Sequence, residues 1–134
     1  PPPPPPPPPR LGVNVRVDIA VIDEGGAQPM RKNITLTTAD RQNASARSDG
    51  ESGGPVILNV DVVPTVEGLP PGKILVRVGL DYLPPASDPK QRVARTRLLF
   101  GLTLDDGKKI IASETADPVG ERRVRVEVTA TILK

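Results

Sequence analysis

The side chains of this chain that could do chemistry are carboxylates, cations and hydroxyls, because His, Cys and Trp are all absent. That absence removes imidazole and thiolate catalysis together with the usual zinc and copper ligands. Asp105 and Asp106, in the stretch LDDGKK, are hard oxygen ligands, but a calcium loop needs six or more oxygens. We assign this stretch to a turn, and we predict no metal ion and no cofactor.

Three further carboxylates, Asp18, Asp23 and Glu24, could form an acid–base pair. No spacing in the sequence brings two of them into one cleft, so we assign them to the solvated surface. The chain is therefore predicted not to be an enzyme, and a small-molecule ligand is not expected.

Arginines alternate along two segments, with Arg95 and Arg97 in one and Arg123 and Arg125 in the other. Such a stripe could face phosphate or a sulfated sugar. Single-stranded nucleic acids are normally bound with interleaved aromatic residues, which make up only 1% of this chain. The net charge is only +2. We predict cross-strand ion pairs with acidic residues such as Glu127, and no nucleic-acid partner.

The apolar residues recur with the period of a β-strand along most of the chain. The first predicted strand covers residues 13–22 and places on one face Val13, Val15, Val17, Ile19 and Val21. Further strands are predicted at KNITLTT, at NASARS after a bend at ADRQ, at VILNVDVV, at KILVRVGLDYL, and in VARTRLLFGLTL, KIIASE and RRVRVEVTATIL. Pro64 is expected to close the VILNVDVV strand, since proline cannot donate to a ladder.

These seven or eight strands, joined by turn-rich loops, predict an antiparallel β-sandwich of the Ig-like or Greek-key type. We expect a polyproline arm over residues 1–11 and one sandwich domain over residues 12–134. The DDGK turn at 105–108 predicts a β-hairpin between its flanking strands. Loops are expected at SDGESGGP and PPASDP, and the core should be rich in Val because aromatic residues are scarce.

Nine consecutive prolines precede the first strand, and a polyproline II rod of this length extends about 28 Å at about 3.1 Å per residue. They are Pro1, Pro2, Pro3, Pro4, Pro5, Pro6, Pro7, Pro8 and Pro9. The tract is open to three interpretations: a spacer, a ligand for an aromatic groove on another protein, or an arm for self-assembly. We favour self-assembly, with the chain itself as the partner.

Two forms of that assembly are possible. In one, strand 13–22 leaves its own domain and completes a neighbour's sheet by strand addition. In the other, the strand stays in its own sheet and only the prolines cross to a neighbour. A head-to-tail contact that does not close generates an open filament.

Residues 55–114 resemble the C-terminal domain of bacterial secretins, the outer-membrane ring proteins. The resemblance lies in PVILNVDVVPTVEG, in GKILVRVGLDYL and in RTRLLFGLTLDDGKKIIASE. There too a strand ending in Pro, a long second strand and an Arg-led hairpin with an Asp-Gly turn follow one another. The chain departs from the pattern at ASETAD, where secretins have Gly-Gly-Leu, and no gate hairpin is apparent. The resemblance implies a bacterial envelope or secreted β domain that oligomerises.

We therefore predict a structural subunit of a secreted bacterial filament, assembled through the proline arm. The absence of long apolar runs predicts no membrane-spanning segment. A start at Pro instead of Met favours removal of a leader and an extracellular or cell-surface location. The alternative is a monomeric sandwich on a proline stalk that binds carbohydrate or a protein.

Overall fold

A computed structural model describes residues 2–5, 12–24, 30–48, 57–67, 72–83, 96–116 and 123–133. Within these ranges the chain forms eight strands, and the predicted all-β class is confirmed. The strands are β1 (Asn14–Glu24), β2 (Met30–Ala39), β3 (Ala44–Ser48), β4 (Ile57–Glu67), β5 (Lys73–Leu83), β6 (Thr96–Asp105), β7 (Lys109–Ala116) and β8 (Arg123–Leu133). The loop predicted at residues 48–55 begins at Ser48, which is the last residue of β3, and its other residues lie outside the described ones, as does the loop predicted at residues 84–89.

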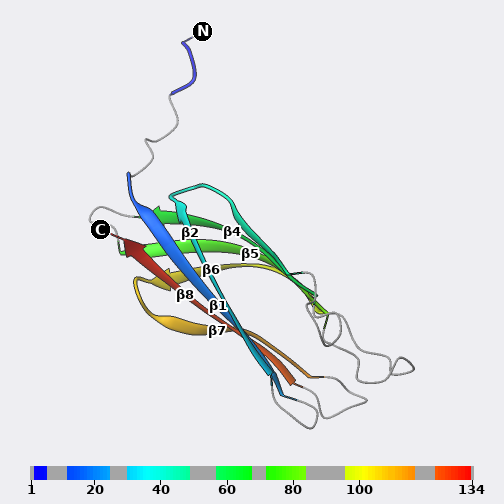
Figure 1. Ribbon diagram of the computed structural model, residues 1–134. Helices are drawn as coiled ribbons and strands as arrows, with labels where there is room; N and C mark the ends of the chain where they lie inside the picture. Colours follow the sequence, from blue (N-terminus) through cyan, green and yellow to red (C-terminus); the bar gives the residue numbers. More distant parts are fainter. Residues whose placement is uncertain are drawn as a thin grey trace.

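The strands form two antiparallel sheets that pack face to face (Figure 1), which confirms the predicted sandwich. Sheet A has the order β2-β1-β8-β7, and sheet B has the order β3-β4-β5-β6. The expected Greek-key order is wrong, because each described strand lies beside its neighbour in sequence, within one sheet or across a corner between the sheets. A Greek key needs a connection that passes over such neighbours.

The core lies between the two sheets and is built mainly from Val. Alternate residues of each central strand point inward, as the period of two requires. Its fully buried members include Val15, Val17, Leu58, Val60, Val62, Ile74, Val76, Val78, Val126, Val128 and Ala130. The apolar residues Leu98, Phe100 and Leu102 of the edge strand β6 are only partly buried against this core.

The predicted hairpin at residues 105–108 is wrong, because β6 belongs to sheet B and β7 to sheet A. The Lys108 N–H donates to the Asp105 carbonyl over 3.1 Å and closes a turn. Gly107 has a positive φ of 77°, whereas Asp106 does not. Type I′ hairpin turns need positive φ at both central residues. This turn is instead a corner that passes the chain from one sheet to the other.

Pro64 does not end its strand, contrary to the prediction, since β4 continues to Glu67. The Pro64 carbonyl accepts a hydrogen bond from the Arg41 N–H at 2.7 Å, at the corner before β3. In a strand the N–H and C=O of one residue point to the same side. The missing N–H of Pro64 therefore faces the space beyond the start of β3, where the β4 ladder needs no donor.

The second half of the chain repeats the first, with the two sheets exchanged. The corner between β2 and β3 and the corner between β6 and β7 have the same backbone hydrogen bonds. The bond from Asp40 N to Val13 O (3.1 Å) matches that from Asp106 N to Gly72 O (3.2 Å). The bond from Arg41 N to Pro64 O (2.7 Å) matches that from Gly107 N to Ala130 O (2.8 Å). The bond from Gln42 N to Ala39 O (3.0 Å) matches that from Lys108 N to Asp105 O (3.1 Å).

The corner side chains match as well. Asp40 accepts a hydrogen bond from the Val66 N–H at 2.7 Å, and Asp106 accepts one from the Ile132 N–H at 2.8 Å. Each bond spans 26 residues of sequence. Strands β1–β4 are therefore related to β5–β8 by a pseudo-two-fold axis, so that β1 corresponds to β5 and β4 to β8.

Candidate functional site

The residues predicted to serve assembly in strand 13–22 are part of the domain's own core. β1 pairs with β2 on one side and with β8 on the other, along almost its whole length. Val15, Val17, Ile19 and Val21 are buried, and Val13 packs against the core from just before the strand. In this single chain the strand lies in its own sheet, and its donation to a neighbour stays a prediction.

The predicted arm is described only in part. Pro2, Pro3, Pro4 and Pro5 are exposed. Pro1 and Pro6, Pro7, Pro8 and Pro9 lie outside the described residues, and their part in assembly stays a prediction.

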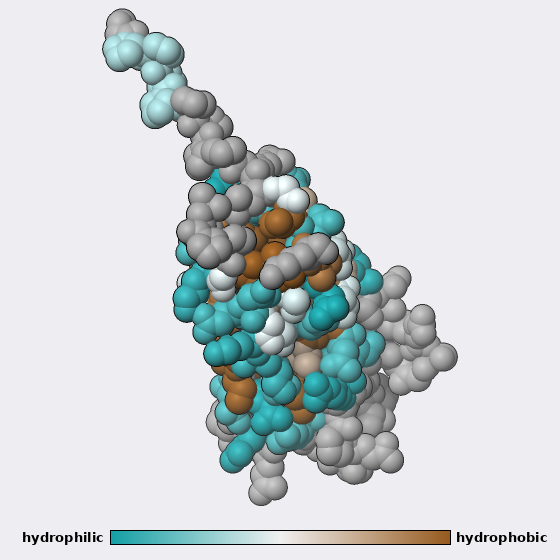
Figure 2. Space-filling view, turned by 90° about the vertical axis from the view of Figure 1, so that its left-hand side faces the viewer, coloured by the Kyte–Doolittle hydropathy of each residue, from teal (hydrophilic) through white to brown (hydrophobic). Residues whose placement is uncertain are grey.

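Among the described strands, one edge of the sandwich carries exposed apolar residues. β6 forms the outer strand of sheet B and contains no Pro, and its charged residues, Arg97 and Asp105, lie near its two ends. Its Leu99 is 88% exposed, and across the corner Ile111 of β7 is 55% exposed. On the face drawn in Figure 2, apolar residues in brown reach the surface between polar ones in teal. From Leu98 to Leu104, β6 carries neither a charge nor Pro, and an uncharged stretch of an edge strand is a site where another chain can add a strand.

The carboxylates of the predicted turn are occupied by structural contacts. Asp105 pairs with the Lys73 ammonium, which lowers the pKa of Asp105 below its usual value of 3.8. Asp106 holds the Ile132 N–H. In the described part of the chain, no three acidic residues gather in a way that could hold a metal ion.

Two arginines of the predicted basic stripes, Arg97 and Arg125, take part in ion pairs. Arg97 Nε lies 3.7 Å from Asp81 Oδ1, and Arg125 Nη2 lies 3.9 Å from Glu24 Oε1. Both pairs join neighbouring strands, as predicted. Arg95 lies outside the described residues.

Asp23 is not a surface carboxylate, contrary to the prediction. It is 3% exposed, and its Oδ2 accepts a hydrogen bond of 2.7 Å from the Tyr82 hydroxyl. Asp18 is half-buried and accepts hydrogen bonds from Arg16 at 3.2 Å and from Thr35 at 2.7 Å. The bond between Asp23 and Tyr82 joins the two sheets, whereas the bonds of Asp18 stay on the outer face of sheet A.

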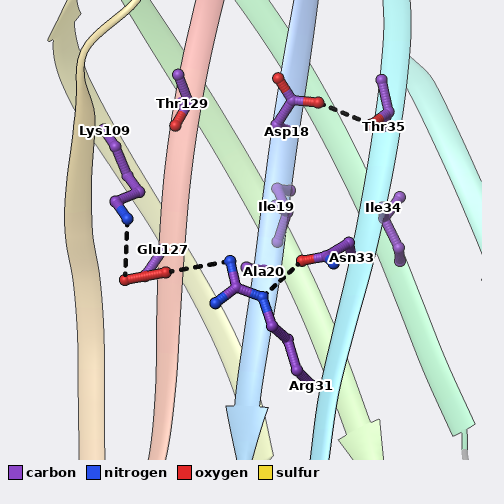
Figure 3. Close-up of a pocket in the computed structure, with 10 residues that line it drawn as sticks. All are labelled: Asp18, Ile19, Ala20, Arg31, Asn33, Ile34, Thr35, Lys109, Glu127 and Thr129. Atoms are coloured by element: carbon purple, nitrogen blue, oxygen red, sulfur yellow. Dashed lines mark hydrogen bonds and ion pairs between the residues drawn. The ribbon is translucent and has the colours of Figure 1, made fainter.

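The outer face of sheet A carries a hollow of about 270 Å³. Ala20 lies between Asn33 of β2 and Glu127 of β8 in the strand register. Because the Ala20 side chain is a single methyl group, it leaves space between its larger neighbours. The hollow is lined by Asp18, Ile19, Ala20, Arg31, Asn33, Ile34, Thr35, Lys109, Glu127 and Thr129 (Figure 3).

Glu127 is the most buried charged residue of this hollow, at 7% exposure. Figure 3 shows the Arg31 guanidinium reaching across β1 toward Glu127, with Lys109 on the other side. The distances are 3.8 Å from Arg31 Nη2 to Oε1 and 3.6 Å from Lys109 Nζ to Oε2. Arg125 Nε lies 3.9 Å from Oε2. Among the described residues, Glu127 Oε1 and Arg125 Nε are buried without any hydrogen-bond partner.

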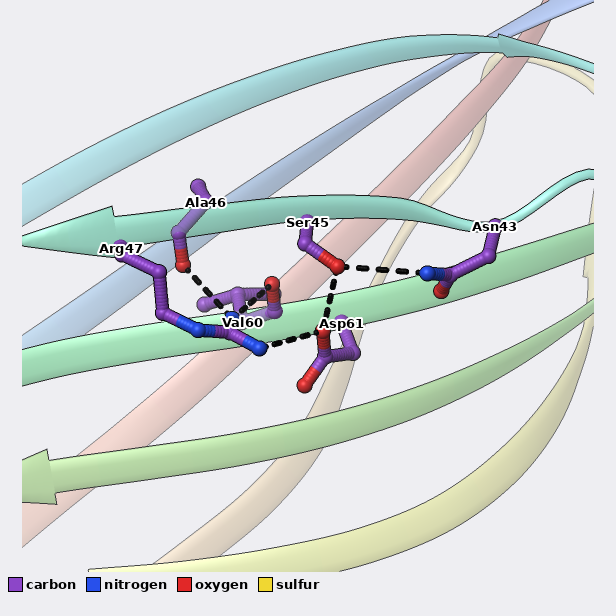
Figure 4. A network of polar contacts seen from close by, with 6 residues as sticks. All are labelled: Asn43, Ser45, Ala46, Arg47, Val60 and Asp61. Carbon is purple, nitrogen blue, oxygen red and sulfur yellow. Dashed lines mark hydrogen bonds and ion pairs between the residues drawn. The ribbon is translucent and has the colours of Figure 1, made fainter.

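The equivalent carboxylate of sheet B, Asp61, is more exposed and accepts hydrogen bonds from its own chain at Oδ1 (Figure 4). Asp61 accepts hydrogen bonds from the Ser45 hydroxyl and, at 2.9 Å, from Arg47 Nη2. The bond from Ser45 is the main cause, and that from Arg47 the second, of a lowered pKa at Asp61. Asn43 in turn donates to the Ser45 oxygen at 3.3 Å.

The burial of Glu127 and Asp40 was not predicted from the sequence. A signal was present for Glu127, because the outward face of the first strand carries Ala20 and Ile22 where charged residues would be expected. Both are buried, at 8% and 7% exposure. Nothing in the sequence pattern distinguishes Asp40 from other turn aspartates, because its burial depends on Val66 of a distant strand.

No protein-family model matches this chain, and no curated protein matches it by sequence. Solved structures do match. The T2SS secretin XcpQ of Pseudomonas aeruginosa aligns with a TM-score of 0.57 at 10% identity, over 91% of this chain and 59% of the secretin chain. The fold resembles that of a secretin.

The secretin InvG of the Salmonella SPI-1 type III secretion injectisome aligns with a TM-score of 0.44 at 11% identity, over 91% of this chain and 62% of that one. This chain therefore spans less than two thirds of either secretin. The likeness also extends well beyond residues 55–114, where the sequence resemblance was found. In the part of the chain that the structure describes, no helix is long and apolar enough to cross a membrane.

Proposed function

We propose that this chain is a structural subunit that assembles head to tail with copies of itself, as a filament at or outside the bacterial cell surface. The observation that carries the proposal is the β6 edge, the outermost of the described strands of sheet B, where exposed Leu99 and half-buried Phe100 leave apolar surface at the side of the sandwich. A second copy would cover this surface and extend sheet B by strand addition.

The topology supports a head-to-tail contact. Each sheet has four antiparallel strands, so its two edge strands run in opposite directions. When copies are added in one orientation, β6 of one copy meets β3 of the next, and β7 meets β2. Both new pairs are antiparallel, and the antiparallel alternation of both sheets continues without interruption. Such a heterologous contact gives a ring if its rotation closes and a filament if it does not.

The proline arm favours the open form. β1 is paired with β2 and β8 of its own domain. Residues 1–11 are therefore the part of the N-terminal segment that can contact a neighbour. A polyproline rod of about 28 Å can reach beyond the adjoining edge strands. The fold supports the cellular setting, since the similar structure XcpQ is a secretin of a bacterial secretion system.

Negative-stain microscopy and sedimentation of the full chain test the proposal. We expect filaments at high protein concentration, and we expect Leu99→Lys to prevent them, because a charge on an edge strand blocks pairing. Asn59→Lys is the matched control, since it adds the same charge on β4, away from every edge, and should leave assembly intact. A wild-type chain that stays monomeric at high concentration would refute the proposal.

The part played by the arm is tested separately. Deleting residues 1–11 should raise the concentration needed for assembly while leaving the far-ultraviolet circular dichroism spectrum and the melting temperature unchanged. If the truncated chain polymerises as readily as the full chain, the arm takes no part in assembly.

A further inference from the structure

Two glycines lie inside strands of sheet B, where the conformation of the chain does not require them. Gly79 of β5 and Gly101 of β6 are on the outer face of the sheet, and neither has a positive φ. The pairing of β5 with β4 and with β6 runs through them without a shift of register. A Cβ on Gly101 would meet nothing within 4 Å, and one on Gly79 would make only ordinary contacts, at 3.8 Å to Leu99 and 4.0 Å to Asp61.

A glycine inside a strand is unfavourable, because it loses more conformational freedom on folding than other residues and has no side chain to pack. At Gly79 and Gly101 neither a turn, nor a bulge, nor a steric conflict with the described residues accounts for the missing side chain. The remaining common reason for such a glycine is the close approach of another backbone.

The side chains beside the two glycines are apolar, apart from one free cation. Arg77 lies between Val63 of β4 and Gly101 in the strand register, and Gly79 lies opposite Leu99, which is 88% exposed. Arg77 is exposed, and among the described residues it has no ion-pair or hydrogen-bond partner. We call this surface the Arg77 patch; it consists of Val63, Arg77, Gly79, Leu99 and Gly101.

A backbone that lies on this patch must offer acceptors and no donors. The backbone groups of β5 are used in the ladders with β4 and β6, so an N–H group above them would find no backbone acceptor, and a buried unpaired N–H is costly. A polyproline segment has no N–H, and its carbonyls have no internal partners. Its rings could pack on Leu99 and on the bare glycine backbone, while its carbonyls accept from the Arg77 guanidinium.

The chain itself contains a segment of this kind. Residues 2–5 are exposed prolines, so in this structure they are not held on a surface of their own domain. From β4 to β6 the patch extends over two strand spacings, about 10 Å. Four residues of polyproline II cover about 12 Å, so part of the arm is long enough to cross the patch, and the rest can serve as a spacer.

We propose that the Arg77 patch binds the proline arm of a second copy of this chain. The proposal rests on the proposed function, because it requires copies to meet, and it names the surface that holds the arm. An anion would satisfy Arg77 but would gain nothing from Leu99 or from the glycines, and the nearby carboxylate Asp61 is already paired with Arg47.

The patch has none of the aromatic residues that line the usual grooves for polyproline segments. The arm alone is therefore expected to bind weakly. A simultaneous contact at the β6 edge would raise its effective concentration.

Saturation-transfer-difference NMR with a free nonaproline peptide and the full chain is the test, because it detects weak binding and works with monomers and polymers alike. We expect a saturable signal from nonaproline and none from a glycine–serine peptide of the same length, whose N–H groups would stay unpaired. Absence of a nonaproline signal, or an equal signal from the control peptide, would overturn the proposal.

Variants locate the binding. Gly79→Val fills the space above the sheet with a residue favoured in strands, so it should abolish peptide binding without lowering the melting temperature. Arg77→Gln should weaken binding about tenfold, the usual contribution of a hydrogen bond from a charged donor. Thr131→Val is the matched control on β8, a central strand of sheet A, and should bind as the wild type does. Equal binding by the wild type and Gly79→Val would refute this site.

These variants separate the patch from the proposed filament, because Arg77 and Gly79 lie on β5, away from the β6 edge. If nonaproline binds at the patch but the full chain forms no filaments, only the proposed function fails. If Gly79→Val forms filaments at the same protein concentration as the wild type, and deletion of residues 1–11 still raises that concentration, only the patch fails.

A disulfide cross-link tells whether the arm comes from a second copy. The chain has no cysteine, so Pro4→Cys combined with Gly101→Cys introduces one thiol in the arm and one in the patch. Mild oxidation should link different chains, giving a ladder of oligomers on a non-reducing gel. A monomer with an internal disulfide would overturn the assignment to a second copy.

Discussion

Asp23 and Tyr82 occupy equivalent positions in β1 and β5, and they are joined across the core by a hydrogen bond of 2.7 Å. The bond therefore crosses the pseudo-two-fold axis and ties sheet A to sheet B. The two side chains are 3% and 1% exposed. The two halves differ in chemistry at this pair, and the difference provides an acceptor on one side and a donor on the other.

Tyr82→Phe should lower the free energy of unfolding by about 1–2 kcal/mol, because it removes a donor from a buried carboxylate while keeping the ring. Urea denaturation measures the loss. In the double variant with Asp23→Asn the two losses should be less than additive. Additive losses would mean that the two side chains act independently.

The two corners predict opposite responses to substitution. Arg41 has a φ of 64° where the second corner has Gly107. A left-handed conformation is unfavourable for a residue with a Cβ. Arg41→Gly should therefore raise the free energy of unfolding by about 0.5–1 kcal/mol, and Gly107→Ala should lower it by about 1 kcal/mol. Chemical denaturation of both variants checks the pair, and a stabilising Gly107→Ala would contradict it.

The place of Pro64 predicts where a second proline is tolerated. Ala130 is its equivalent, since its carbonyl accepts the Gly107 N–H as that of Pro64 accepts the Arg41 N–H. Ala130→Pro should leave the strand signal in circular dichroism unchanged. Val128→Pro should unfold the domain, because Val128 is paired with both β1 and β7. Loss of structure in Ala130→Pro would show that the halves are not equivalent here.

Asp61 predicts a local acid dependence. Its pKa is lowered chiefly by the Ser45 hydroxyl and then by Arg47. A depressed folded-state pKa contributes stability that is complete above the unfolded value of 3.8 and is lost as the pH falls through the folded value. Ser45→Ala should raise the pKa of Asp61 in an NMR titration and reduce the acid-dependent loss of stability. The pKa of Asp105, which Lys73 holds low, should not move in this variant.

Much of the fold follows from the alternation of apolar residues. Residues 13–22 predict β1 and its inward face because a strand with one buried face must place every second side chain inward. The same pattern predicts β5 with its observed bounds, Lys73–Leu83. Alternation also predicts the bend before β3, since ADRQ interrupts the apolar period.

The pattern could not show how the strands connect in space. A turn such as DDGK is compatible with a hairpin and with a corner, and the choice depends on the Asp106 contact with Ile132 and the Gly107 contact with Ala130. These partners come from the end of the chain. The hollow at Glu127 was missed for the same reason, because it is made by residues of four strands that only the register brings together.

The pairing of Asn14 with Leu133 has a consequence for chain connectivity. The ends of the domain lie side by side, as the adjoining ends of β4 and β5 do at Glu67 and Lys73. A circular permutant that joins β8 to β1 by a short loop and opens between β4 and β5 would have the same wiring diagram as the native chain. The polypeptide could thus start either at β1 or at β5 without a change in the architecture of the domain.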